Sequence, residues 1–410
     1  MGAEQEKSLD SDPRVVKRLA RVIGPGLIVA ATVLGPGTIT VASISGSLMG
    51  YSILWAVVIA GIFMTTFTRV SARIGCAQDR SLLEIVSSRY GKPLAVLSGF
   101  AVFFITAGFQ TGNNIGVGLA MQAMIGGTIP VWAFLFLGIA LVIIWTAKDF
   151  YHMLELVMKG LVLLMIVAFV LNIFMAGPSV TGILSGLVPG RPQVWGLVIA
   201  ISATSFSIAG AAYQSYMVQA KGWKKDDYKA ASRDSIAGIA VLAGLTALIM
   251  ITAASVLAPE GIVVQSAIDM AIQLEPLLGP AAKWLFLLGL LSASFSSFIA
   301  NASLGGMMLS DGLGLGNSIN DKSVKVLTTA LLVLSTVVAA TLRENPIELL
   351  VLAQATTILG GPLIAIVLTV IGNDKNVMGE DTNSLPVNVI SILAIGWILY
   401  LSFNQLMNFL

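Results

Sequence analysis

The segment from Ile28 to Thr40 reads IVAATVLGPGTIT and places Gly35-Pro36-Gly37 inside an otherwise apolar run. Proline lacks the amide proton that a helix needs and its ring clashes with the preceding turn, while glycine lowers helix propensity further. The segment therefore predicts a helix that unwinds near its middle. A simple proline kink is the competing interpretation, since proline is a common cause of kinks in helices.

The composition of the whole chain indicates where such a helix lies. Of the 410 residues, 56% are hydrophobic and only 11% are charged. Soluble domains carry about 25% charged residues, so this chain cannot cover a water-facing surface. The composition excludes a soluble enzyme, a nucleic-acid binder and a disordered protein, and it predicts an all-α polytopic protein whose surroundings are a lipid bilayer.

Apolar segments long enough to cross a bilayer, which takes about 20 residues, occur eleven times. They lie at 23–46, 51–74, 94–126, 129–147, 154–176, 194–219, 236–258, 281–310, 324–342, 347–372 and 386–409. A polar head at 1–22 precedes the first of them. That first segment is too long for the core of a cleavable signal peptide and is followed by further spans.

The sixth span carries a second, weaker interruption, because residues 205–214 read SFSIAGAAYQ with a glycine but no proline. The two interrupted spans open two halves of five helices each. This pairing is the best sequence indication of a transporter built from inverted repeats. We expect a first repeat at 23–176, a second at 194–372 and an added eleventh helix at 386–410. Backbone carbonyls freed at Leu34 and Ala209 can bind a cation, while helix N-termini near Gly37 and Ala212 can hold an anionic group.

The basic residues fall almost entirely on alternate connections between the spans. Twenty of the 23 lie in the head or in the even-to-odd connections, and three lie on the other side: Arg191, Lys283 and Arg343. Cytoplasmic loops are enriched in Lys and Arg. We therefore expect a multi-pass protein of the cell (inner or plasma) membrane, with a cytoplasmic N-terminus and an external C-terminus.

Short motifs along the whole chain match one transporter family in order and spacing. They are Gly24-Pro25-Gly26, Gly50-Tyr51, Leu54-Trp55, Arg73-Ile74-Gly75, Arg89-Tyr90, Leu291-Ser292-Ala293-Ser294, Asp311-Gly312, Leu352-Ala353-Gln354 and Gly361-Pro362-Leu363. On these motifs the chain resembles the NRAMP family of divalent-metal transporters. The resemblance implies the LeuT-type fold and transport by alternating access.

The chain departs from the family at the residues that the resemblance would make metal ligands. The family's first-helix motif is Asp-Pro-Gly-Asn, where this chain has Gly35 to Thr38, and its sixth-helix Met-Pro-His aligns with 211–213, which read AAY. Gln110 and Asn113 stand where the family has an Asp and a Glu used for proton movement. Of the family's residues near the metal, only Gln354 keeps its type.

The candidate site is therefore a neutral one. The predicted substrate-binding residues are Leu34, Gly35, Gly37, Thr38, Ala209, Gly210, Ala211, Tyr213, Gln214 and Gln354, and the predicted pathway residues are Gln110, Asn113 and Asn114. Thr38 and Gln354 are the candidate metal ligands, either directly or through water. None of the 21 acids lies near the middle of a predicted span, although a dehydrated divalent ion needs compensating negative charge.

Two functions fit this neutral site. The first is uncoupled transport of a partly hydrated divalent cation; Mg²⁺ fits best because it dehydrates reluctantly and is often held through waters. Some NRAMP-related proteins are magnesium transporters. The second is transport of a small organic solute such as an amino acid, without a metal site. Neither function involves a cofactor, a nucleic acid or an enzymatic reaction, and neither requires more than a monomer.

Overall fold

The computed structural model describes residues 24–146, 148–341 and 345–407, so the polar head lies outside the described residues. Within these ranges the chain is helical and contains no strand. The helices, with α for α-helix and η for 3-10 helix, are α2 Pro25–Val33, α3 Pro36–Met49, α4 Leu54–Ala77, α5 Leu82–Tyr90, α6 Lys92–Ile125, α7 Ile129–Thr146, α8 Lys148–Ala176, α9 Val180–Gly186, α10 Trp195–Ser205, α11 Ile208–Ala220, η1 Lys225–Asp227, α12 Tyr228–Val256, α13 Ala267–Ile272, α14 Glu275–Leu278, α15 Ala281–Leu313, α16 Lys322–Thr341, α17 Pro346–Thr356, η2 Thr357–Gly360, α18 Gly361–Asn373, α19 Lys375–Met378 and α20 Leu385–Met407.

The predicted membrane spans are confirmed. In the described part of the chain, nine helical segments are long and apolar enough to cross a membrane, and the number rises to eleven if each of two bent helix pairs is one span. Each of the eleven segments overlaps one of the eleven predicted from apolar runs; the fifth is a pair, Gly160–Ala176 and Val180–Gly186, bent by 118°. The side chains that α20 exposes include Ile392 and Leu393, as expected where lipid rather than water covers the surface.

The first span is broken rather than merely kinked. Helix α2 ends at Val33 and α3 begins at Pro36, and the two helix axes differ by 62°. Pro36 is the first residue of α3, where its missing amide proton costs nothing and its fixed φ suits a helix start. The residues between them, Leu34 and Gly35, have extended backbone.

The sixth span breaks at Phe206–Ser207, slightly earlier than its glycine suggested. Helix α10 ends at Ser205 and α11 begins at Ile208. The Ser207 hydroxyl accepts a hydrogen bond from the Gly210 amide at 3.3 Å and so caps α11. The expectation that the Ala209 carbonyl is freed is wrong, because Ala209 lies inside the first turn of α11. A serine that caps a helix start decided the position of the break.

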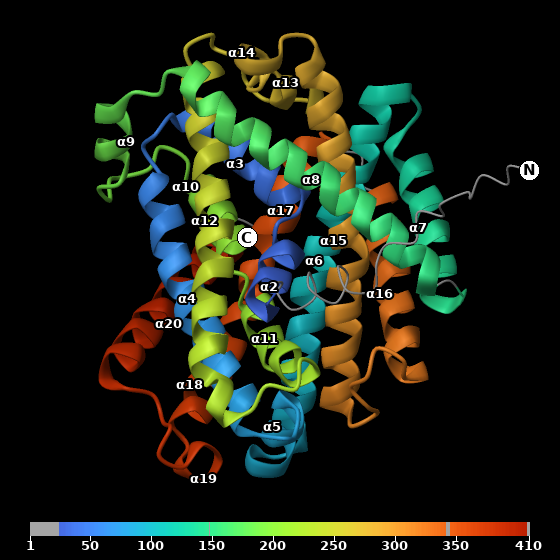
Figure 1. Ribbon diagram of the computed structural model, residues 1–410, viewed down its shortest axis with the longest axis vertical. Helices are drawn as coiled ribbons and strands as arrows, with labels where there is room; N and C mark the ends of the chain where they lie inside the picture. Colours follow the sequence, from blue (N-terminus) through green and yellow to red (C-terminus); the bar gives the residue numbers. More distant parts are fainter. Residues whose placement is uncertain (1–23, 147, 342–344, 408–410) are drawn as a thin grey trace, which may run out of the picture.

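The long helices α6 and α15 cross the middle of the molecule side by side, and α15 also contacts the short helix α2 (Figure 1). Helix α2 packs tightly on α12 through glycines. A Cβ on Gly26 would lie 2.4 Å from the Asp234 carbonyl oxygen, and one on Gly238 would lie 2.2 Å from the Gly26 carbonyl oxygen. Small residues allow this close approach of helix backbones in membrane proteins.

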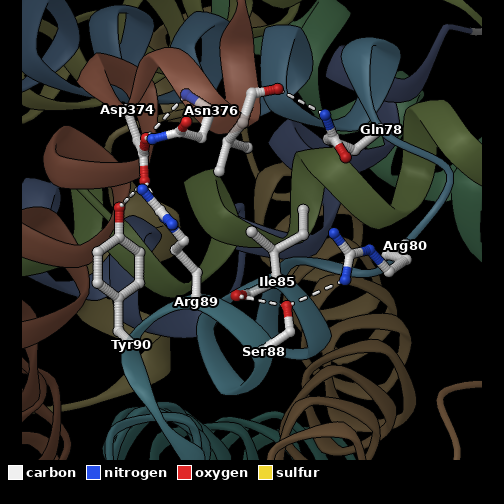
Figure 2. A network of polar contacts seen from close by, with 9 residues as sticks. Gln78, Arg80, Ile85, Ser88, Arg89, Tyr90, Asp374 and Asn376 are labelled. Atoms are coloured by element: carbon white, nitrogen blue, oxygen red, sulfur yellow. Dashed lines mark hydrogen bonds and ion pairs between the residues drawn. The ribbon is translucent and has the colours of Figure 1, made fainter.

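One end of the bundle, formed by α5, η1 and α19 and here called the basic end, is held by polar contacts between distant segments. Arg89 of α5 donates from Nε to Asp374 at 2.8 Å, and Tyr90 donates its hydroxyl to the same carboxylate at 2.8 Å. Figure 2 shows these side chains converging on Asp374, which precedes α19. The contacts of Arg89 and Tyr90 therefore tie α5 to the chain between α18 and α20.

This network predicts an acid-sensitive contribution to stability. Hydrogen bonds from Arg89, Tyr90 and the Asn376 amide hold the pKa of Asp374 well below its ordinary value. A lowered carboxyl pKa stabilises the fold above the unfolded-state pKa of about 4, and that contribution disappears as the pH falls through the folded-state pKa. We expect Asp374→Asn to lower the melting temperature at neutral pH and to lose this effect progressively below about pH 4.

Melting curves of the purified protein between pH 3 and pH 8 test this. Asp226→Asn is the control, because Asp226 is an exposed acid at the same end, and its melting temperature should follow that of the unmodified chain. A difference between Asp374→Asn and the unmodified chain that stays constant down to pH 3 would contradict the prediction.

Candidate functional site

The carbonyl groups released at the end of α2 are held by side chains of α15. The Ser297 hydroxyl donates to the Leu34 carbonyl at 3.2 Å, and the Asn301 amide donates to the Thr32 carbonyl at 3.1 Å. Ser297 and Asn301 are one helical turn apart on α15. Only the tertiary structure shows that they support the break.

The start of α3 faces this break without a side-chain cap. Gly35 is the N-cap residue of α3 and offers no side-chain oxygen. Thr38 is 1% exposed, and its hydroxyl donates to the Val33 carbonyl at 3.3 Å, which spans the break from α3 back to α2. The hydroxyl oxygen keeps lone pairs that can accept a hydrogen bond or bind a cation.

Gln354 of α17 inserts its carboxamide between α3 and α6. A Cβ on Gly37 would lie 2.3 Å from Cδ of Gln354, and a Cβ on Gly112 would lie 2.1 Å from its Nε2. Gln354 is 1% exposed, and its Oε1 has no hydrogen-bond partner among the described residues. Because a buried, unpaired amide oxygen is costly, this atom is a candidate ligand for a substrate. The sequence did not indicate the role of Gly112.

The polar cluster of α6 divides between the break and helix α16. Asn113 lies next to the break, since its Oδ1 would be 3.2 Å from a Cβ on Gly35. Its amide donates to the Gln110 Oε1 at 3.1 Å. Asn114 instead contacts α16, where it accepts a hydrogen bond from Thr336 at 3.0 Å. Of the three predicted pathway residues, Asn113 therefore contacts the first break, and Gln110 is linked to it through Asn113.

Among the predicted site residues of α11, some contact the first break and others are directed elsewhere. Gly210 approaches the end of α2, because its Cβ would lie 2.8 Å from a Val33 methyl carbon. Gln214 donates from Nε2 to the Ser235 hydroxyl of α12 at 3.1 Å. Tyr213 stacks on Tyr216, with ring centroids 6.4 Å apart. Ala209 and Ala211 are buried. The contacts thus join Gly35, Gly37, Thr38, Asn113 and Gln354 around the first break, whereas Gln214 is directed toward α12.

The site is electrically neutral. Among the described residues, Asp311 is the one buried charged side chain, and it accepts hydrogen bonds from Ser81 at 2.8 Å and Tyr216 at 2.5 Å near the end of α15. The same residues contain no cluster of three or more His, Cys, Asp or Glu side chains that can hold a metal ion. The groups available around the first break are therefore carbonyl, carboxamide and hydroxyl oxygens and the amides that begin α3.

Comparisons with known proteins place this arrangement in a family. The pattern of the natural resistance-associated macrophage protein-like family, Nramp, matches residues 26–408. A divalent metal cation transporter MntH of Deinococcus radiodurans is 25% identical over 402 residues, covering 94% of this chain and 88% of that protein. The MntH of Yersinia enterocolitica is 25% identical over 395 residues, covering 94% and 95%.

The fold is also that of a solved transporter. The crystal structure of a mutant of the Eremococcus coleocola manganese transporter superposes with a TM-score of 0.76 at 17% identity, covering all of this chain and 88% of that one. The chain therefore has the LeuT-type architecture with interrupted helices that the sequence predicted. The family pattern spans nearly the whole chain, and on that match the protein belongs to the NRAMP family of multi-pass membrane transporters.

Proposed function

We propose that this protein transports a divalent cation that keeps part of its hydration shell, with Mg²⁺ as the best candidate. Sequence similarity supports a divalent cation as the substrate class, because the similar proteins are divalent metal cation transporters. The one observation that carries the proposal is the buried, unpaired Oε1 of Gln354, whose carboxamide packs against Gly37 in the first turn of α3.

Neutral oxygens suit a hydrated ion better than a bare one. A dehydrated divalent cation in a low-dielectric site needs negative charge beside it, and no carboxylate is in contact with the described residues of the break. Mg²⁺ usually keeps several waters when proteins bind it. Thr38, Asn113 and Gln354 can hydrogen-bond such waters, and the absence of a thioether removes the preference for softer transition metals.

Transport by alternating access without proton coupling completes the proposal. The break at Leu34–Gly35 separates α2 from α3, which allows α2 to move as a unit. A proton relay needs groups that titrate near physiological pH, and neither Gln110 nor Asn113 does so. We propose in addition that the N-terminus lies on the cytoplasmic side, which the distribution of Lys and Arg supports, and that the inverted repeats are those expected from the sequence at 23–176 and 194–372.

A small organic solute with a carboxylate is the second candidate. The observation that favours it is the start of α3, which has no side-chain cap and so presents amide donors and the positive end of the helix dipole to the break. Such a helix start binds an anionic group without a metal, as in transporters with discontinuous helices.

Ligand-dependent thermal stabilisation separates the two functions. The purified protein is heated with Mg²⁺, Mn²⁺, Ca²⁺ or a panel of amino acids, and a ligand that binds only the folded state raises the melting temperature. We expect Mg²⁺ to do so, and Gln354→Ala and Thr38→Ala to abolish the shift. Stabilisation by amino acids alone would refute the cation proposal, and an intact Mg²⁺ shift in both variants would place the cation elsewhere.

Uncoupled transport predicts that the cation moves without protons. In proteoliposomes containing a pH dye and an ion-sensitive dye, Mg²⁺ entry is expected to leave the internal pH unchanged when the membrane potential is clamped. Liposomes without protein report the leak. Acidification that follows Mg²⁺ entry and requires the protein would contradict this mechanism.

A further inference from the structure

A cavity of about 240 Å³ lies between α4 and the start of α20, away from the helix breaks. Its lining includes Arg69 and Arg73 of α4, Tyr228 at the start of α12, and Pro386, Val387 and Ile390 of α20. One wall is thus basic and the other apolar. Arg69 and Arg73 are four residues apart on one helix, so their side chains lie on the same face and their like charges repel.

The two arginines lack acidic partners in the described part of the chain. Arg69 donates from Nε to the Ser232 hydroxyl at 2.8 Å, and its terminal amino groups have no partner there. Arg73 donates to the Thr382 carbonyl and to the side chain of Asn383, while its buried Nε has no partner. Asp381, which acts on Arg73 only through longer-range electrostatics, is ion-paired with Lys225 at 2.6 Å. Donors remain on both arginines for an anion between them.

The cavity lies near the ends of two predicted membrane spans. Arg69 and Arg73 lie eight and four residues before the last residue of α4, Ala77, which is about 12 Å and about 6 Å along the helix axis. Helix α20 begins at Leu385, beside the cavity. Long arginine side chains near helix ends extend to the membrane interface. Ile392 and Leu393, further along α20, are 65% and 61% exposed, so acyl chains cover the adjacent surface.

From this geometry we infer that the cavity binds the phosphate of an anionic phospholipid, with the guanidinium groups of Arg69 and Arg73 on the phosphate and the lipid's glycerol and acyl chains against Val387 and Ile390. Arginine forms strong, directional hydrogen bonds to phosphate. Basic pockets between membrane helices on the cytoplasmic side recognise such headgroups, and this cavity lies toward the basic end. The apolar wall favours a lipid over free phosphate, because inorganic phosphate leaves that wall uncovered.

The test measures the melting temperature of the delipidated, full-length protein in detergent against added phosphatidylglycerol, phosphatidylcholine or millimolar inorganic phosphate. We expect phosphatidylglycerol to raise it saturably and the other two to have little effect. Arg69→Gln should weaken the apparent affinity by about fivefold, in line with the contribution of one basic residue near an anionic lipid surface. Arg69→Lys should retain most of that affinity.

Two further variants keep the test decisive. Arg80→Gln is the matched control, because Arg80 lies at the same end but contacts Ser88 outside the cavity, and its response should be unchanged. Val387→Glu places a carboxylate opposite the arginines and should remove the response while both arginines remain. Equal stabilisation by phosphatidylcholine, an unchanged response in Arg69→Gln or Val387→Glu, or equal stabilisation by inorganic phosphate would each overturn the lipid assignment.

Discussion

Replacing Gly37 with alanine is expected to reduce transport at least about tenfold while the protein still folds. The added Cβ would lie 2.3 Å from Cδ of Gln354 and 2.6 Å from its Oε1, so the carboxamide must leave its position. Gln354 is 1% exposed, and close-packed neighbours leave it little room. A tenfold loss corresponds to about 1.4 kcal/mol of binding free energy. Alanine also has the higher helix propensity, so α3 itself should not be weakened.

Initial rates of Mg²⁺ uptake into proteoliposomes, together with melting temperature, test this prediction. Gly112→Ala should give the same loss from the opposite side, because its Cβ would lie 2.1 Å from Nε2 of Gln354. Gly244→Ala is the control, since a Cβ on this α12 glycine meets nothing within 4 Å. Normal uptake by both Gly37→Ala and Gly112→Ala would show that the position of Gln354 does not matter for transport.

Replacing Gly35 with aspartate is expected to tighten divalent-cation binding by about tenfold or more, most strongly for Mn²⁺. The backbone suits the residue, because Gly35 is extended with φ −123°. The added Cβ would lie 3.2 Å from Asn113 Oδ1 and 3.3 Å from Ser297 Oγ, so these two side chains must shift by a few tenths of an ångström. Aspartate is also a favoured N-cap residue. A carboxylate beside a cation in a low-dielectric site is worth more than 1.4 kcal/mol, the equivalent of about tenfold in affinity.

Calorimetric titration of Gly35→Asp with Mn²⁺ and Mg²⁺ measures the effect. Gly35→Asn is the matched control, with nearly the same shape and no charge, and should leave both affinities close to those of the unmodified chain. The same aspartate would repel an anionic solute at the start of α3. Weaker amino-acid binding together with unchanged cation affinity in Gly35→Asp would therefore favour the organic-solute function.

Local patterns were enough to predict the spans and the first break. Lipid demands about 20 apolar residues per helix, so span positions follow from composition alone. Proline acts on its own backbone and on the turn before it, so the helix break at Gly35-Pro36-Gly37 could be predicted from the local sequence. The second break lies at Phe206–Ser207 because the Ser207 hydroxyl accepts a hydrogen bond from the Gly210 amide and so caps the start of α11.

Contacts between segments that are far apart in the chain could not be predicted from the sequence in the same way. Ser297 and Asn301 of α15 donate hydrogen bonds to the carbonyl groups of Leu34 and Thr32, more than 260 positions away in the sequence. Nothing in the local sequence of Gly112 predicts that it packs against the side chain of Gln354. Such pairings depend on how helices cross, and crossing is set by side-chain packing over the whole bundle.

The sequence by itself determined that this chain is a multi-span helical membrane protein with an interrupted first helix, and it predicted a candidate site without carboxylates. Hydrophobicity, proline geometry and charge are properties of each residue in its place. Only the tertiary structure decided that Gln354 lies between Gly37 and Gly112, that Gln214 is directed toward α12, and that Arg69 and Arg73 face an apolar wall of α20. These arrangements require segments far apart in the chain to meet, and the free energy that selects them comes from packing and hydrogen bonding across helices.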